Sequence, residues 1–390
     1  MTQESAARRS ENLAALSGFA ALLVGIGIGR FGYPPLIPVI VREGMVTANA
    51  ANVAAATNFL GYLAGALIAA SVAEKLGVKR TLILALAATT VSFAACALPG
   101  TGAVALAAWR FVSGLTGGLL MIITPRFVMA AVPAERRGII SGLMFGGVGL
   151  GIVISGAALP AIGSRGGACA FLFLGVLTGA ASLVSWRLMP KVQPVLPRLT
   201  GVSAPHWRGP LLGLAAAYCG FGAGFAGHTI FMVDYISRGL GRGDGAGSAA
   251  WVLMGLGSTG GVIFWGRLAD RFGAPLVLRI AQTSMAAFVA LAALTTSSAG
   301  LYASAFGAGA CGLALGSLTA MRAAELVDFA DYTRTWALLT IVFSLCQAGS
   351  GYVLAWIFAQ SGSYPLVFAL CAAALAATIA AEYFLARKKS

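Results

Sequence analysis

Residues 247–273 read GSAAWVLMGLGSTGGVIFWGRLADRFG, an apolar run that ends in a short charged segment. The part before Arg267 holds no Asp, Glu, Lys or Arg, and its length is close to the roughly 20 residues that a helix needs to cross a bilayer. The charged segment marks where the chain leaves the membrane. This stretch therefore predicts a transmembrane helix followed by a tight turn at Gly273.

The composition extends this prediction to the whole chain. Of the 390 residues, 59% are hydrophobic and 10% are charged, whereas a soluble domain carries about 25% charged residues. The apolar runs of about 20 residues predict helices, because the strands of a membrane β-barrel are about half as long and alternate in polarity. We therefore expect an all-α integral membrane protein.

Twelve such runs predict two bundles of six helices each. The predicted spans are 13–41, 50–73, 81–98, 103–131, 139–163, 167–189, 209–236, 247–268, 274–297, 299–327, 335–359 and 363–386. The segment 190–208 contains four prolines and few large apolar residues, which is typical of a linker. We therefore expect an N-terminal bundle at 1–189, a cytoplasmic linker at 190–208 and a C-terminal bundle at 209–390.

The distribution of Lys and Arg predicts the orientation. With both termini in the cytoplasm, most basic residues fall on the cytoplasmic side, as in other inner-membrane proteins. Those expected outside are Arg42, Arg165, Arg238 and Arg242. This bias accounts for the net charge of +14 without a nucleic-acid partner.

Several classes of site are not supported by the residues present. The six cysteines lie in apolar spans without a C-x-x-C pair, so we interpret them as small buried hydrophobes and not as disulfides or metal ligands. They are Cys96, Cys169, Cys219, Cys311, Cys346 and Cys371. The chain has two histidines and no phosphate-binding G-x-x-x-x-G-K-[ST] loop, so we expect no metal, no cofactor and no ATP-driven activity.

The two halves resemble each other at a shift of about 195 residues. Gly25-x-Gly27-x-Gly29 matches Gly220-x-Gly222-x-Gly224, and Glu74-Lys75-Leu76-Gly77 matches Asp270-Arg271-Phe272-Gly273. Thr124-Pro125-Arg126 matches Ala320-Met321-Arg322. Internal repeats of this kind are typical of secondary transporters, whose solute sites lie near the bilayer midplane.

Two motifs resemble those of the major facilitator superfamily. One is Gly266-Arg-Leu-Ala-Asp270-Arg271-Phe-Gly273, with a weaker copy at 70–80, and the other is Arg110-x-x-x-Gly114-x-x-x-Gly118. The resemblance implies gating loops at the cytoplasmic ends of the helices. The residues assigned to them are Glu74, Lys75, Gly77, Lys79, Arg80, Arg126, Gly266, Asp270, Arg271, Gly273, Arg322 and Glu325. For Arg322 and Glu325 we prefer a local ion pair.

Three further stretches are similar to the YbfB/YjiJ-type branch of that superfamily. They are 27–38, which reads GIGRFGYPPLIP, 58–65, which reads NFLGYLAG, and the glycine-rich run 146–151. The branch resemblance implies a bacterial inner-membrane transporter whose solute is mostly unassigned.

Arg30 is the most informative single residue, because it lies near the middle of the first predicted span. An arginine at that depth costs about 3 kcal/mol on insertion scales, so we expect a ligand or a structural partner for it. The residues predicted to bind or translocate solute are Arg30, Tyr33, Asn58, Tyr62, Arg110, His228 and Gln347.

Alternatives stay open for several of these. Asn58, Gly61, Tyr62 and Gly65 share one helical face, which is either a packing seam or a ligand contact. His228 is either a proton or solute site or a satisfied buried histidine. Asp234 is either a proton site or an interfacial residue.

The predicted function is secondary active transport, not enzymatic catalysis. The cations Arg30 and Arg110 weakly favour an organic anion as the solute, with proton coupling through His228 or Asp234 and with uniport and exchange left open. We expect a monomer in the lipid bilayer, with a small molecule and protons as partners. A membrane-embedded enzyme or lipid-handling protein needs clustered catalytic groups, and a transporter-like sensor needs a signalling segment; neither feature is present in the sequence.

Overall fold

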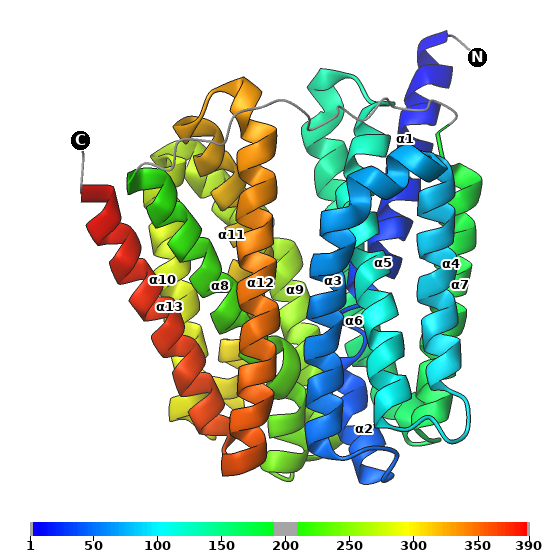
Figure 1. The fold of residues 1–390 in the computed structure, drawn as a ribbon, viewed down its shortest axis with the longest axis vertical. Helices are drawn as coiled ribbons and strands as arrows, with labels where there is room; N and C mark the ends of the chain where they lie inside the picture. Colours follow the sequence, from blue (N-terminus) through cyan, green and yellow to red (C-terminus); the bar gives the residue numbers. More distant parts are fainter. Residues whose placement is uncertain (1–2, 191–208, 388–390) are drawn as a thin grey trace. The chain divides into compact units, whose positions relative to one another are not determined.

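The computed structural model describes residues 3–190 and 209–387, so most of the predicted linker lies outside the described residues. The first described part contains α1 (Gln3–Leu22), η1 (Leu23–Ile28), η2 (Pro34–Leu36), α2 (Ile37–Arg42), α3 (Ala48–Leu76), α4 (Val78–Cys96), α5 (Ala103–Met129), η3 (Ala134–Arg136), α6 (Arg137–Gly163) and α7 (Gly167–Leu188) (Figure 1). The second contains α8 (Gly209–Asp234), η4 (Tyr235–Gly239), α9 (Gly243–Phe272), α10 (Ala274–Leu294), α11 (Ser298–Leu326), α12 (Phe329–Ser361) and α13 (Tyr364–Arg387).

The prediction of an all-helical, multi-pass membrane protein is confirmed. Among the described residues, 12 helical segments are long and apolar enough to cross a bilayer. Large apolar side chains lie exposed on their outer surfaces, for example Val104 at 85%, Val176 at 65% and Leu84 at 56%. Such surfaces are stable only against lipid, because water would disfavour so much exposed apolar area.

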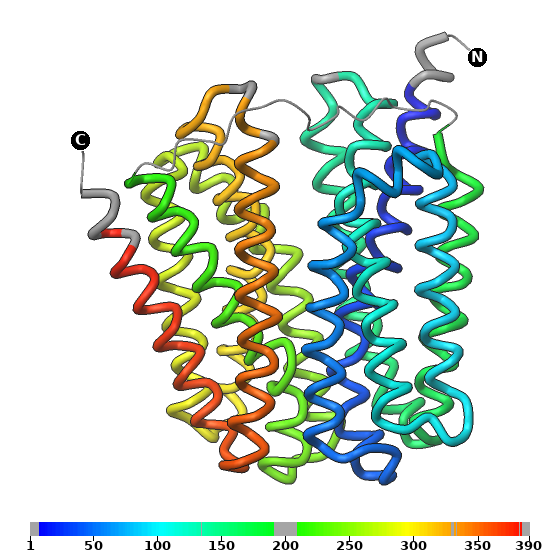
Figure 2. The backbone as a smooth tube through the Cα atoms, in the orientation of Figure 1, coloured from blue at the N-terminus to red at the C-terminus, as the bar shows by residue number. Residues whose placement is uncertain are grey.

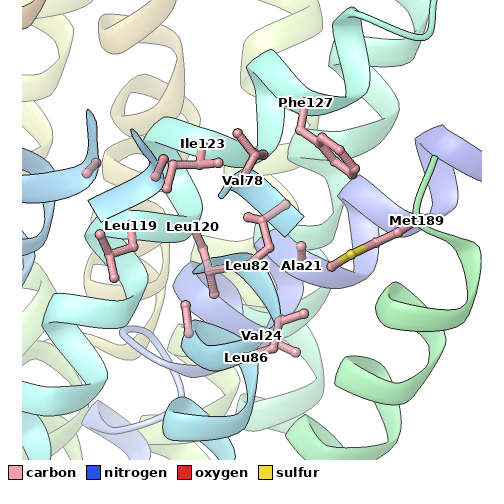
Figure 3. Close-up of a cluster of buried hydrophobic side chains, with 13 residues drawn as sticks. Ala21, Val24, Val78, Leu82, Leu86, Leu119, Leu120, Ile123, Phe127 and Met189 are labelled. Carbon is pink, nitrogen blue, oxygen red and sulfur yellow. The ribbon is translucent and has the colours of Figure 1, made fainter. Parts of the chain in front are cut away.

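The chain forms two compact units, Met1–Arg198 and Leu199–Ser390. Figure 2 traces the backbone through the helices of each unit. In the first unit, a core of buried apolar side chains joins α1, α4 and α5, with Leu82, Leu120 and Phe127 among its members (Figure 3). Met189, just after α7, packs against the same core.

The same close helix crossing occurs in both units. In the first, a Cβ atom on Gly65 of α3 would lie 2.0 Å from the carbonyl oxygen of Leu115 on α5. In the second, a Cβ on Gly261 of α9 would lie 2.0 Å from the carbonyl oxygen of Ala310 on α11. Only glycine permits this backbone approach, and the matching contacts support the internal repeat predicted from the sequence.

A single glycine connects the second and third membrane helices of each unit. Gly77 joins α3 to α4 with φ 84° and ψ 144°, and Gly273 joins α9 to α10 with φ 85° and ψ 146°. Other residues rarely adopt this conformation. The predicted ends of these spans were therefore wrong by several residues, because α3 and α9 continue through the charged motif and leave one residue for the turn.

The first predicted span, 13–41, is not one continuous helix. It changes to a π-helix at Leu23–Ile28, turns at residues 29–33 and resumes with Pro34–Leu36 and α2. The amides of Gly29 and Phe31 bond five residues back, to Val24 and Ile26. Pro34 and Pro35 have no N–H to continue the ladder, which explains why the helix breaks here.

The interpretation of all six cysteines as unpaired was wrong. Cys219 on α8 and Cys346 on α12 form a disulfide, with their Cα atoms 5.5 Å apart. The two cysteines are 127 residues apart and meet through the packing of their helices, so no local spacing motif predicts the disulfide. Cys96, Cys311 and Cys371 are free and buried as expected, whereas Cys169 is exposed.

Candidate functional site

The break in the first membrane helix brings the predicted residues of the first unit together. It leaves the carbonyl oxygen of Gly29 outside the helical ladder, and side chains from two other helices bond to it. Arg110 Nη1 donates to this oxygen at 2.9 Å and Ser113 Oγ at 2.8 Å, both from α5. Asn58 Nδ2 on α3 lies 3.5 Å from it. The break is therefore held open by polar side chains and not by chain flexibility.

Arg110 is a structural centre of this arrangement. It is 3% exposed, and its guanidinium lies 4.5 Å from the ring centroid of Tyr33. Its own backbone oxygen accepts a hydrogen bond from Asn58 Nδ2 at 3.1 Å. Asn58 Oδ1 is buried and accepts no hydrogen bond from the described residues. Arg110 thus links α5 to the broken helix, and Asn58 links α3 to both.

Arg30 lies at the same break but in a different environment. Its side chain is only partly buried, whereas that of Arg110 is fully buried. Its guanidinium lies 4.5 Å from the ring centroid of Phe59, 5.3 Å from that of Phe31 and 5.5 Å from that of Tyr62. Aromatic faces around a guanidinium stabilise its charge inside a protein.

The predicted stripe on α3 includes a packing seam. Gly61 and Gly65 pack against the backbone of α5. Asn58 bonds to the backbone of α5 and lies near the break, and the ring of Tyr62 lies 5.5 Å from the guanidinium of Arg30. Packing therefore accounts for the glycines, whereas ligand contact by Asn58 and Tyr62 stays a prediction.

The sequence repeat pairs Tyr33 with His228, but Tyr33 lies in the break of the first membrane helix and His228 lies inside α8. The Tyr33 hydroxyl donates to the backbone oxygen of Ala51 at 3.1 Å. His228 is 0% exposed, and its Nε2 lies 2.8 Å from Ser304 Oγ, which itself donates to a backbone oxygen of α10 at 2.6 Å. Nε2 is therefore the protonated nitrogen, and Nδ1 has no hydrogen-bond partner among the residues described.

Asp234 sits in a closed cluster at the end of α8. It is 0% exposed and accepts two hydrogen bonds from Arg238, at 2.5 and 2.6 Å, and one from the Tyr364 hydroxyl at 2.6 Å. The rings of Tyr235 and Tyr364 stack beside it with centroids 5.1 Å apart. This pairing ties α8 and η4 to the start of α13.

Gln347 is buried on α12, 1% exposed, and neither polar atom of its amide has a hydrogen-bond partner within residues 3–190 and 209–387. Sequence reasoning missed what lies beside it. Tyr218, Phe221 and Phe225 occupy one face of α8. Tyr218 stacks on Phe343 of α12 and lies tilted against Trp336, and Phe221 lies tilted against Phe343. The spacing of the three α8 rings, at i, i+3 and i+7, was the available signal.

The residues predicted to gate lie near the helix ends. Glu74 and Lys75 are exposed on the last turn of α3, Lys79 and Arg80 lie on the first turn of α4, and Arg126 is on the last turn of α5. Gly266, Asp270 and Arg271 lie on the last turns of α9. The expected ion pair is present, with Arg322 Nη1 2.8 Å from Glu325 Oε2. Among the described residues, no three His, Cys, Asp or Glu side chains could hold a metal ion together.

Comparison with known proteins gives a consistent result. A family model described as "Uncharacterised MFS-type transporter YbfB" matches residues 22–383. The structure is similar to a mutant form of the nucleoside transporter NupG, with a TM-score of 0.76 and 11% identity over 96% of this chain and 99% of that one. It is also similar to a D-xylose-proton symporter, with a TM-score of 0.72 and 14% identity over 97% and 96%. At these identities the two structures show the fold alone, and no curated protein matches the chain.

Proposed function

The chain belongs to the YbfB-type family of major facilitator superfamily transporters, as its motifs predicted, and from this premise we propose that it carries a small organic anion across the bacterial inner membrane by alternating access. The family and the fold make it a membrane transporter. The solute class, the coupling, the cytoplasmic placement of both termini and a monomeric state are parts of the proposal.

The environment of Arg30 carries the proposal of an anionic solute. The aromatic rings of Phe59 and Tyr62 lie 4.5 and 5.5 Å from its guanidinium, and the side chain is partly exposed at a break in a membrane helix. A guanidinium stacked on rings keeps its N–H groups in one plane, which matches the plane of a carboxylate. A partly buried cation attracts an anion more strongly than a cation in bulk water, because the surrounding protein screens the charge less.

Proton coupling is proposed through His228. Asp234 is the weaker candidate, because Arg238 and Tyr364 already satisfy both of its carboxylate oxygens. His228 presents Nδ1, a buried acceptor with no bond to any described residue.

Uptake by proteoliposomes tests the anionic solute. Purified protein is reconstituted, a set of labelled small carboxylates is screened, and each acid that is taken up is compared with its neutral amide. We expect the acid and not the amide to be transported. Arg30→Gln should lower the initial rate at least 100-fold, because the substitution removes a charged hydrogen-bond partner from a low-dielectric site.

Arg165→Gln is the matched control, because Arg165 is an exposed arginine in the turn between α6 and α7. It should transport at the wild-type rate. If Arg30→Gln takes up the acid within twofold of the wild-type rate, the proposal of an arginine-bound anion is wrong. A proton gradient applied to the same vesicles should accelerate uptake by wild type and not by His228→Gln.

A further inference from the structure

A layer of five aromatic rings lies between two helices of the second unit. We name Tyr218, Phe221 and Phe225 of α8 and Trp336 and Phe343 of α12 the aromatic layer. Ring centroids are 4.8 Å apart for Tyr218 and Phe343, 5.2 Å for Phe221 and Phe343, and 5.9 Å for Tyr218 and Trp336. The α8 rings are buried, whereas Trp336 and Phe343 are partly exposed. The layer therefore presents ring surface that a flat ligand can reach.

Gln347 extends this surface by one helical turn. It follows Phe343 by four residues on α12, so the two side chains lie on the same face of the helix. Its amide oxygen and nitrogen are both buried and lack a hydrogen-bond partner among the described residues. A buried amide with neither its donors nor its acceptor satisfied is costly, and such an exception in a native structure calls for a physical explanation.

The surroundings hold the layer rigidly in place. The disulfide between Cys219 and Cys346 joins α8 to α12 at residues adjacent to Tyr218 and Gln347. On α11, a Cβ atom at Gly312 would lie 2.9 Å from the ring of Phe225, so a glycine is what leaves room for that ring. A pre-organised site loses less freedom on binding and is therefore a better receptor.

We propose that the aromatic layer and Gln347 form a solute subsite within the second unit, for a planar aromatic ring bearing a carboxamide-like pair of donor and acceptor. The ring stacks on Phe343, one helical turn from Gln347, and the pair completes the hydrogen bonds of the Gln347 amide. This inference rests on the proposed transport function for the identity of its ligand as solute.

The chemistry of Gln347 selects the ligand class. A primary amide offers one acceptor and two donors in one plane, so a second carboxamide or a lactam meets it with two parallel hydrogen bonds. A site built to bond such a group rejects analogues that lack it, because its own buried amide then stays unsatisfied. A flat ring gains from offset stacking, which a puckered ring does not.

Binding of benzamide to the purified wild-type protein tests the subsite. Titration calorimetry and thermal unfolding are measured with benzamide, with cyclohexanecarboxamide, which keeps the amide without the flat ring, and with N,N-dimethylbenzamide, which keeps the ring without the donor. We expect benzamide to bind at least tenfold more tightly than either analogue. Failure of the wild-type protein to bind benzamide, or equal affinity for the three probes, would overturn the proposal.

Variants of Gln347 separate a ligand role from a structural one. Gln347→Leu should weaken benzamide binding at least tenfold and raise the melting temperature of the ligand-free protein, because it removes two unsatisfied buried groups. A structural glutamine would give the opposite result, a lower melting temperature with unchanged affinity. Gln282→Leu is the matched control, since Gln282 is a buried glutamine on α10, outside the aromatic layer. An equal loss of affinity in this control would also overturn the proposal.

The result is distinguishable from failure of the proposed function. Benzamide carries no charge, so Arg30→Gln should bind it within twofold of wild type even though transport of acids is lost. If acids are transported without Arg30 while Gln347→Leu still loses benzamide, the anion proposal fails and the subsite stands. If benzamide binds equally well to Gln347→Leu, the subsite fails whatever the transport assay shows.

Discussion

The two arginines inside the membrane region should fail in different ways when each is replaced by methionine. Arg110 donates to the Gly29 carbonyl at 2.9 Å and lies 4.5 Å from the Tyr33 ring, and it is fully buried. A charge-assisted hydrogen bond contributes about 1.5–3 kcal/mol. A desolvated cation–π contact contributes about 1–2 kcal/mol. Relief of the desolvation of the guanidinium offsets part of this sum, so we expect Arg110→Met to lose about 3 kcal/mol of stability.

Arg30→Met should behave in the opposite way. Arg30 is partly exposed as a residue, and its methionine replacement keeps an apolar chain against Phe59 and Tyr62. We expect a stability change below about 1 kcal/mol, because exposed cation–π contacts are weak, together with loss of anion uptake.

Thermal unfolding of the detergent-purified proteins measures the difference. At about 2–4 °C per kcal/mol for a unit of this size, Arg110→Met should melt roughly 6–12 °C below wild type. Arg30→Met should stay within about 4 °C of wild type by the same conversion. A protein with Arg110→Met that melts like wild type and fails only in transport would refute the structural role that we derive for this residue.

Three further substitutions test other features of the structure. Gly273→Ala should lower stability by about 1–2 kcal/mol in thermal unfolding, because φ is 85° there, and unchanged melting would contradict the need for glycine. Replacing Cys219 and Cys346 together by serine should lower the melting temperature, because their disulfide closes a loop of 127 residues and such a closure stabilises a protein by up to about 5 kcal/mol. A reductant should lower the melting temperature of the wild type and not that of the double variant; an equal decrease in both would contradict this role of the disulfide. Asp234→Asn should lower stability by about 1–3 kcal/mol, because it removes the buried charged acceptor of hydrogen bonds from Arg238, whose side chain is 28% exposed, and a double-mutant cycle with Arg238→Met should recover most of that loss.

Much of the fold followed from local features of the chain. Apolar runs of bilayer length predicted the twelve spans, and the matching positions of Gly77 and Gly273 predicted the repeat. The extension of α3 and α9 through the charged motif was missed, because charges are poor markers of helix ends when the side chains extend into water. The family resemblance then fixed the class of protein.

The break at Arg30 shows where sequence reasoning stopped. The glycines and prolines of residues 25–35 were visible signals of an interrupted helix, and the hydropathy of the run hid them. That Arg110 stabilises the break, from a position 81 residues away from Gly29, depends on the packing of α5 against the first helix and has no local signature. The disulfide and the contacts of the α8 rings with α12 had no local signature for the same reason.

The hydrogen-bond partners of buried polar residues were only partly predictable. Asp234 and Arg238 are four residues apart, so their pairing was visible from helical geometry once both were placed on one helix. The third partner, Tyr364, comes from α13 and needed the structure. His228 and Ser304 likewise meet only through packing of α8 on α11.

The one-residue connections at Gly77 and Gly273 have a mechanical consequence. Two long helices that share a single turning residue have no slack chain between them, so a tilt of one displaces the end of its neighbour by a comparable amount. The two helices of each pair, α3 with α4 and α9 with α10, are thus mechanically coupled at the end where they join. Inserting a few flexible residues at either connection would let the two helices tilt independently while their packed contacts stay the same.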